Sequence, residues 1–364
     1  MNLYSNKHTI AIFDILGDKG GMLDYHLGTI QGLKSASINA IAWTSSSFQC
    51  KNVRNRFRIL WLVPKVIRIF LFFILSSSCL LEIRLKGITK INFHFFHYNL
   101  QNRYLLLIAR ILGLHIILTI HDIQPFGPLK NQRVKLQFFL KKADLIIVHN
   151  EDVKYGLQQK FDLTTEIFVA KHGNYIKDKR QKFREITGLK QLAVLGRMKR
   201  EKGVIDALQM MTLSGSDDLH LMLAGKCDDD FAKEIREFIA SNHLYNKVTF
   251  IPRYLNSLEF ESSIQATDLC LFPYNKVFQS GLVLHVMSLG IPVLCSDLPF
   301  FKDLITHGKT GLLYKSGDIQ SFMEVVMEIK RGNYDLNYMR EQAFSMVKSE
   351  YSWEDSFQGI NQYL

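Results

Sequence analysis

A cluster of basic residues follows a short apolar run in the second half of the sequence. The stretch AVLGRMKREKGVIDAL, residues 193–208, begins as a buried strand and then carries Arg197, Lys199, Arg200 and Lys202. Cations and free backbone amides at the start of a helix attract phosphate groups. Arg197 offers a planar fork and Lys202 a mobile point charge, which makes this pair the best candidate for holding a diphosphate. A solvated loop has the same composition, and the spacing alone does not decide between the two.

Two further glycine turns carry residues that suit oxygen-rich ligands. Ser280 and Gly281, in FQSGLVLHVMSLG, open a predicted helix whose first amides suit phosphate or hydroxyl oxygens. His285 lies four residues beyond Gly281, on roughly the same helix face. The turn GDKGG at 17–21 is not the G-x-G-x-x-G of a dinucleotide site, and no acidic residue follows where a nicotinamide ribose requires one. The sequence therefore gives only weak support for dinucleotide binding.

Strands of a parallel sheet must position these residues. Short apolar runs alternate with amphipathic stretches, which is typical of βαβ units whose sheet is buried on both faces. The runs end at polar, glycine or histidine residues, and ligands bind outside the carboxyl ends of such strands. The sequence predicts an α/β protein with two Rossmann-like doubly wound lobes that face each other across a central cleft. The runs and their endings are TIAIFDILGDKGG, KINFHFFHYN, HIILTIHDIQP, LIIVHNED, IFVAKHGN, QLAVLGRMKREKG, LHLMLAGKCDD, KVTFIPRY, DLCLFPYNKVFQSG, IPVLCSDLPFF and GLLYKSGD.

The polar segment 172–190 separates the two halves of the chain. A chain of 364 residues is long enough for two domains, because single cores usually stop growing at about 250 to 300 residues. Segment 172–190 is charged and weakly periodic, as expected of a hinge. We expect an N-terminal lobe at 1–175 and a C-terminal lobe at 176–349.

Positive charge is concentrated in residues 51–90. The chain has a net charge of +11, and this segment holds nine Lys or Arg against the single acid Glu82. Inside it, Ile69–Leu81 carries no charge for 13 residues, fewer than the roughly 18 to 20 needed to span a bilayer, so we expect no crossing. Two interpretations stay open. The segment is a core helix, or its basic flanks bind an anionic membrane surface while apolar side chains enter the interface.

Other features narrow the class of protein. No zinc-finger spacing, aromatic-basic RNA signature or basic heptad is present, so nucleic acid is not an expected partner. The five cysteines are scattered without metal-type pairing, and we expect them to be reduced and mostly buried. The N-terminal stretch lacks the pattern of an export signal, which favours a cytosolic location.

Several motifs occur together in a known order. GRMKREKG resembles the G-R-x4-K-G phosphate-binding element of glycosyltransferases of the GT-B fold, in particular the family-four group. SGLVLHVMSLGIPVLCSD followed by GLLYKSGD resembles the nucleotide-sugar segment of that group. The resemblance covers about residues 190–325, and more loosely the whole chain. It implies two Rossmann-like lobes and a nucleoside diphosphate sugar as donor.

The resemblance assigns donor roles in the second lobe. Arg197 and Lys202 would neutralise the departing diphosphate in place of a metal, because charge develops there as the sugar leaves. Ser280, Gly281 and Leu282 would hold the donor together with His285. The family usually has two glutamates here, and aligned on MSLGIPV they fall at Val277 and His285. His285 either bonds a hydroxyl or is a buried helix histidine, and the stereochemical outcome stays open.

In the first lobe, GDKGGMLDYHL resembles the family's first glycine-rich loop, where Gly20 and Gly21 would let backbone approach the donor and the acceptor. TIHDIQP resembles the strand that ends in a histidine near the acceptor. His121 is the leading candidate to orient or deprotonate the acceptor hydroxyl, since imidazole titrates near working pH; a structural histidine is the alternative. Asp18, Asp122, His149 and His172 are reserves for that role. The end of the chain, about 350–364, resembles the family's tail helix that crosses back to the first lobe, with Trp353 as anchor.

Together these features predict a metal-independent hexosyltransferase with no cofactor beyond the nucleoside diphosphate sugar. The expected acceptor is a hydroxyl of a lipid-linked glycan in bacterial surface-polysaccharide assembly, met at the inner face of the cell membrane. A nucleotide-sugar epimerase of the same fold and a non-catalytic membrane-bound partner are the alternatives. The sugar, the base, the linkage and the oligomeric state are not indicated by the sequence.

Overall fold

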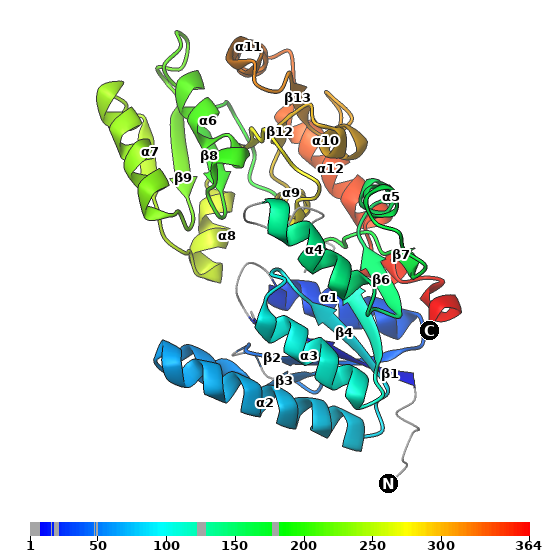
Figure 1. Cartoon of the computed structure of the whole chain (residues 1–364). Coiled ribbons are helices and arrows are strands. Elements are labelled where there is room, and N and C mark those ends of the chain that lie inside the picture. The colour runs from blue at the N-terminus through cyan, green and yellow to red at the C-terminus, as the bar shows by residue number, and fades with distance from the viewer. Residues whose placement is uncertain are drawn as a thin grey trace. The chain divides into compact units, whose positions relative to one another are not determined.

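The computed structural model divides into two units (Figure 1). The first comprises Met1–Gly173 and Tyr351–Leu364, and the second comprises Asn174–Glu350. The boundary expected from the sequence, between 175 and 176, differs from this division by two residues. The structure describes residues 8–15, 17, 22–46, 48, 50–121, 129–176 and 182–364, with backbone alone for 129–133 and 257.

The first unit contains a seven-stranded parallel sheet in the order β3-β2-β1-β4-β5-β6-β7. Its strands are β1 (Thr9–Phe13), β2 (Asn39–Thr44), β3 (Val53–Asn55), β4 (Lys90–His94), β5 (His115–Thr119), β6 (Leu145–Val148) and β7 (Glu166–Val169). Its helices are α1 (Met22–Ser35), η3 (Arg58–Trp61), α2 (Lys65–Leu85), α3 (Leu100–Ile111), α4 (Leu129–Leu140), α5 (Glu151–Lys160), α13 (Trp353–Ser356) and η5 (Ile360–Tyr363).

The second unit contains a six-stranded parallel sheet in the order β10-β9-β8-β11-β12-β13. Its strands are β8 (Gln191–Leu195), β9 (His220–Ala224), β10 (Val248–Ile251), β11 (Leu269–Phe272), β12 (Val293–Ser296) and β13 (Leu312–Tyr314). Its helices are η4 (Arg200–Lys202), α6 (Val204–Met210), α7 (Asp229–Ser241), α8 (Ser257–Gln265), α9 (Gly281–Ser288), α10 (Pro299–Leu304), α11 (Ile319–Lys330) and α12 (Leu336–Glu350).

The predicted class and strand pattern are confirmed: both sheets are parallel, and each of the eleven apolar runs contains a strand. The central strands are buried on both faces because helices cover the sheets. β2 and β3 were not predicted. They extend the first sheet beyond β1, where β2 pairs with β1 in register from Thr9 opposite Asn39.

The end of the chain belongs to the first unit. Trp353 opens α13 and is 6% exposed. Its indole fills space left by two glycines: a methyl group added at Gly28 or at Gly173 would lie 2.1–2.2 Å from indole atoms. The sequence of α1 therefore accommodates Trp353 by omitting a side chain at the point of contact.

Helix α2 corrects one expectation. Only 13 of its residues form the charge-free core, but the helix runs for 21 residues from Lys65 to Leu85 and is long and apolar enough to cross a membrane. Just 28% of its most apolar 18-residue window is buried. Its inner face, which includes Phe72, Cys79 and Ile83, is packed inside the unit, where the helix lies against α3 (Figure 1). The outer face is largely apolar and exposed.

Candidate active site

The basic loop lies between β8 and α6, at the carboxyl edge of the second sheet. Two glycines with positive φ shape it: Gly196 (φ +88°) ends the strand and Gly203 (φ +63°) precedes α6. A methyl group added at Gly203 would lie 1.6 Å from the carbonyl oxygen of Pro273, which follows β11. The Asn275 amide donates to the Glu201 carbonyl at 2.9 Å. The loop is thus fixed against the end of a neighbouring strand.

The four cations of this loop differ in their partners. Lys199 lies 3.4 Å from Glu201, Arg200 pairs with Glu234 on α7, and Arg197 lies 3.6 Å from Asp228. The pairs of Arg197 and Arg200 involve largely exposed groups, so each of these two contributes little.

Lys202 is different. Its side chain is half-buried, its Nζ lies 5.2 Å from the centre of the Tyr274 ring, and within the described residues no carboxylate lies within 4.0 Å of it. Burial lowers its pKa to about 8, with Glu201 opposing the shift and the nearby Arg197 adding to it. Lys202 is therefore a partly desolvated cation whose charge the surrounding side chains leave largely uncompensated.

The start of α9 adjoins this loop. A methyl group added at Gly196 would lie 2.9 Å from a Leu282 methyl group, so the end of β8 and the first turn of α9 are in contact. Ser280 is the N-cap residue of α9, but its side chain does not cap the helix. Burial raises the pKa of the Tyr274 hydroxyl, and the neighbouring Ser280 hydroxyl opposes that shift. Tyr274 therefore lies between Lys202, which is over its ring, and Ser280, which precedes α9.

His285 packs among aromatic rings. Its imidazole stacks on Tyr175 with ring centres 4.4 Å apart and planes at 17°, and Phe260 lies 5.3 Å away on a tilted plane. Of the two interpretations of this residue, the packing favours a structural helix histidine.

The carboxyl edge of the first sheet carries a compact group of rings. His94, His121, His149 and His172 follow four adjacent strands, β4 to β7, and each ring lies 5.2–5.6 Å from that of Tyr25 on α1. We call these five residues the histidine cluster. The Tyr25 hydroxyl bonds His149 Nε2 at 3.2 Å, and His149 Nδ1 bonds the Ala170 carbonyl at 2.7 Å. Both nitrogens of His149 are thus engaged.

His121 lies in this cluster with a fixed ring. Its Nε2 lies 3.0 Å from His94 Nδ1, and its ring stacks on Phe96 with centres 4.7 Å apart and planes at 11°. The expectation that it titrates near working pH is wrong. Burial holds the pKa of His121 well below the ordinary histidine value, and neighbouring histidines add to the shift. Its imidazole is neutral at pH 7.

Several predicted site residues lie outside the described residues, namely Gly20 and Gly21 and the reserves Asp18 and Asp122. The described part of that loop begins with Asp14, whose Oδ2 accepts a bond from the Gly17 amide at 3.0 Å. Sequence reasoning missed Tyr25, His94 and Tyr274. The sequence could have indicated them by position, because His94 and Tyr274 lie at the ends of strands and Tyr25 lies on the helix that follows β1. Among the described residues, no group of three or more His, Cys, Asp or Glu side chains is arranged to hold a metal ion.

A family comparison decides the class of the second unit. The model of the family described as "Glycosyl transferases group 1" matches residues 176–346, which is nearly all of that unit. The second unit is a group 1 glycosyltransferase domain. The resemblance drawn from GRMKREKG and the SGLVLH segment is thereby confirmed.

One relative of this chain has a named activity. The lipopolysaccharide core biosynthesis mannosyltransferase LpsB of Rhizobium meliloti (strain 1021) is 25% identical over 194 residues. That alignment covers 51% of this chain and 50% of LpsB, so the match spans about half the length of the relative.

Solved glycosyltransferase structures share the fold of the whole chain. Sucrose-phosphate synthase from Thermosynechococcus elongatus is 14% identical with a TM-score of 0.71, and 97% of each chain is covered. A glycosyltransferase from Rickettsia africae ESF-5 is 14% identical with a TM-score of 0.69 and 98% coverage of each chain. Anabaena HepE in complex with UDP-glucose is 15% identical with a TM-score of 0.68, covering 97% of this chain and 98% of HepE. The predicted GT-B fold is therefore confirmed.

Proposed function

We propose that this protein is a glycosyltransferase that moves a hexose from a nucleoside diphosphate sugar to a hydroxyl of a lipid-linked glycan during surface-polysaccharide assembly. The group 1 domain supports the transferase class. The role of LpsB in lipopolysaccharide core biosynthesis supports the polysaccharide setting, and the UDP-glucose bound to HepE supports a nucleotide-sugar donor.

The environment of Lys202 is the observation that carries this proposal. A half-buried lysine without a carboxylate partner, beside Tyr274 and in a loop whose first glycine contacts the first turn of α9, is arranged to receive negative charge. As the bond to the sugar breaks, charge develops on the departing diphosphate oxygen, and a cation already in place stabilises it. Arg197 adds a more exposed cation beside it. In this proposal Lys202 and Arg197 supply the charge that a metal supplies in other transferases, and no further cofactor takes part.

The histidine cluster is proposed to orient the acceptor. His121 is held by His94 and Phe96, and a neutral imidazole accepts a hydrogen bond from a hydroxyl. Because its pKa is low, His121 is a weak base, so its proposed role is to position the acceptor oxygen rather than to remove its proton early. Gly20 and Gly21 remain proposed contacts of the donor.

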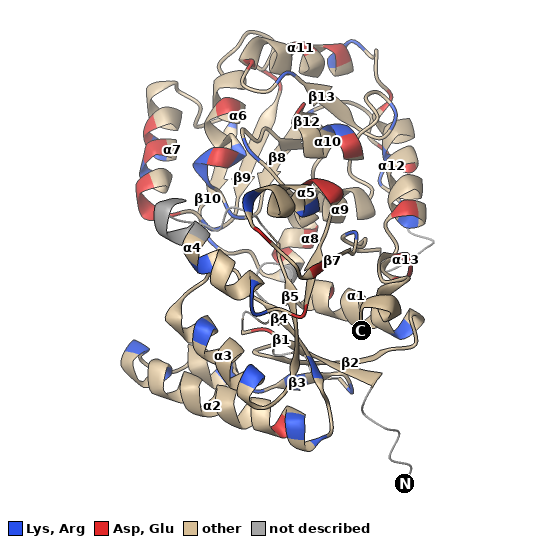
Figure 2. Ribbon diagram, turned by 45° about the vertical axis from the view of Figure 1, so that its right-hand side comes forward, with Lys and Arg blue, Asp and Glu red and all other residues tan. Residues whose placement is uncertain are grey.

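Helix α2 is proposed to rest on the anionic inner face of the cell membrane. Val66, Phe70 and Ile74 recur every four residues on one face and are 69%, 67% and 63% exposed. Lys and Arg gather toward the ends of the helix (Figure 2). A helix whose opposite face is packed inside its own unit does not span a bilayer, but it can insert its outer apolar side chains into the interface. In this proposal the protein binds at the cytoplasmic surface of the membrane, where lipid-linked acceptors are accessible.

One assay tests the function against its alternatives. Purified protein is incubated with a panel of labelled nucleoside diphosphate sugars and bacterial membrane extract. We expect labelled lipid together with released nucleoside diphosphate. A rearranged free donor would instead identify a nucleotide-sugar epimerase. Donor binding without turnover across the panel would identify a non-catalytic partner.

The membrane contact is tested separately. We expect the protein to sediment with vesicles that contain phosphatidylglycerol, and Phe70→Glu to weaken this binding because it places charge in the apolar face. Tyr155→Glu on α5, also at an exposed position, is the matched control. Equal sedimentation of the wild type and Phe70→Glu would contradict the assignment of α2.

A further inference from the structure

A basic cavity lies at the opposite edge of the second sheet from the donor loop. It has a volume of about 490 Å³ and is formed where the chain enters β8, β11 and β12. Its lining includes Lys182, Phe183, Arg184, Thr267, Ile291 and Arg340. The loop that carries Lys202 follows the carboxyl end of β8, whereas this cavity lies at the amino ends of the strands. The two sites are therefore separate.

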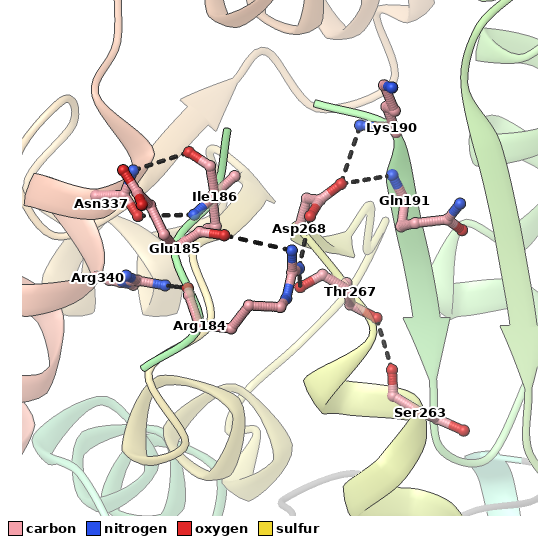
Figure 3. A network of polar contacts seen from close by, with 10 residues as sticks. All are labelled: Arg184, Glu185, Ile186, Lys190, Gln191, Ser263, Thr267, Asp268, Asn337 and Arg340. Atoms are coloured by element: carbon pink, nitrogen blue, oxygen red, sulfur yellow. Dashed lines mark hydrogen bonds and ion pairs between the residues drawn. The ribbon is translucent and has the colours of Figure 1, made fainter. Parts of the chain in front are cut away.

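Arg340, on α12, is the central feature of the cavity. It is only 6% exposed, and within the described residues no carboxylate lies within 4.0 Å of its guanidinium. One of its terminal nitrogens donates to the Arg184 carbonyl, while its Nε is buried without a hydrogen-bond partner (Figure 3). Glu341, Glu185 and Asp335 act on Arg340 only from beyond ion-pair distance, and a buried charge without a close counter-ion is costly.

The nearest buried acid is already engaged. Asp268 Oδ1 accepts from Arg184 at 2.6 Å, and its Oδ2 accepts from the backbone amides of Lys190 and Gln191 at 3.0 and 2.8 Å (Figure 3). Asp268 thus fixes the starts of β8 and β11 and balances Arg184. Its charge is not directed at Arg340. The residues that line the cavity include three cations, Lys182, Arg184 and Arg340, and no acid.

The walls of the cavity also have an apolar part. Arg340 lies over the Phe183 ring at 5.4 Å, and Ile186, Leu289 and Ile291 complete this side. Phe183 is held in place by Phe344, whose ring centre is 5.1 Å away, and by Gly290, where a methyl group would lie 2.1 Å from the ring. A site with a fixed aromatic wall and a buried guanidinium suits an anion that carries an organic group. Its volume is within the range of small-ligand sites.

We propose that this cavity binds a small phosphorylated molecule, with its phosphate between Arg340 and Lys182 and its organic part against Phe183. The guanidinium of Arg340 offers donors in a planar arrangement that matches phosphate oxygens. This site is independent of the proposed donor site, so it does not depend on the proposed function.

The test uses the full chain with Lys202→Ala, which removes the cation proposed to bind a donor diphosphate. Isothermal titration with inorganic phosphate, pyrophosphate and glucose 6-phosphate is carried out on this protein. We expect glucose 6-phosphate to bind at about one site per chain and more tightly than inorganic phosphate. Adding Arg340→Gln should weaken its affinity at least about tenfold.

Two further variants keep the test decisive. Lys182→Ala changes an exposed side chain at the cavity mouth and should weaken binding several-fold without affecting folding. Lys309→Ala, an exposed lysine outside the cavity, is the control and should leave binding unchanged. The proposal would be overturned if none of the three probes bound at concentrations up to about 10 mM. So would binding that neither Arg340→Gln nor Lys182→Ala alters.

Discussion

At the carboxyl edge of the first sheet, four strands end in histidines that pack around Tyr25. At the same edge of the second sheet, a loop with four cations adjoins the start of α9. Burial lowers the pKa of the histidines so that they are neutral, whereas Lys202, with a pKa of about 8, keeps its charge at pH 7. Two domains of one architecture thus carry a neutral, largely buried cluster of rings at one edge and a cationic loop at the other. The difference matches what a glycan hydroxyl and a diphosphate require.

Lowering the pH should have the largest effect, because protons favour the unfolded state through the histidine cluster but leave Lys202 charged as before. Burial lowers the pKa of His149 to about 3 and that of His172 to about 4. Between these values and about 6.5 the unfolded chain binds more protons than the folded one, so stability falls as the pH falls. By linkage each histidine costs about 2 kcal/mol at pH 5.

Tryptophan fluorescence reports this loss selectively, since Trp43, Trp61 and Trp353 are all in the first unit. We expect the denaturation midpoint to drop steeply between pH 6.5 and 4.5. His149→Gln should reduce the pH dependence of the free energy of unfolding by the contribution of about one proton. His220→Gln, in the second unit, should leave it unchanged. A midpoint that is constant over this range would show that the histidine cluster is not held neutral by folding.

Trp353→Ala should be the most destabilising single substitution on the first edge. The indole contacts Tyr25 and His172, with ring centres 5.2 and 5.5 Å away, and fills the space over Gly28 and Gly173. Removing a buried tryptophan costs about 3 to 5 kcal/mol. Chemical denaturation followed by circular dichroism measures the loss. Trp61→Ala, at a position that is 40% exposed, should cost much less; equal losses would mean that Trp353 does not support the cluster.

Gly203→Ala tests the rigidity of the second edge. The added methyl group meets the Pro273 carbonyl oxygen, and φ of +63° is unfavourable for alanine. We expect a loss of about 1 to 3 kcal/mol in the free energy of unfolding. The donor KM should rise as well, because Lys202 adjoins this glycine. Gly332 also has positive φ, but no atom lies near the added methyl group. Gly332→Ala therefore measures the cost of the backbone conformation without that of a steric contact. A donor KM unchanged in Gly203→Ala would show that the loop geometry does not position Lys202.

Much of the fold was predictable because strands buried on both faces have a distinctive sequence. LIIV is apolar throughout and HIILT has an apolar centre, and each ends where the chain turns polar. β2 and β3 were not predicted because their sequences lack such a continuous apolar run. NAIAWT includes two alanines and a polar start, and β3 has only three residues, so pairing with β1 and β2 rather than local preference makes them strands.

The candidate site was predictable by residue type but not by environment. The order of glycines and cations identified the loop of Arg197 and Lys202. It did not show that Arg200 would pair with Glu234 on another helix while Lys202 would have no such partner. The contact of Tyr25 with Trp353 could not be predicted from local sequence either, since 327 residues lie between them. It forms because the end of the chain packs in the first unit.

The pH dependence of kcat/KM for the donor shows whether the charge of Lys202 holds the donor diphosphate. Because this ratio reports groups of the free enzyme, we expect it to fall above about pH 8 in the wild type. Lys202→Arg should extend activity to higher pH, and Lys202→Ala should lower kcat/KM by about 10² to 10³ at pH 7. A kcat/KM that is unchanged in Lys202→Ala, with the same pH profile as the wild type, would contradict the account.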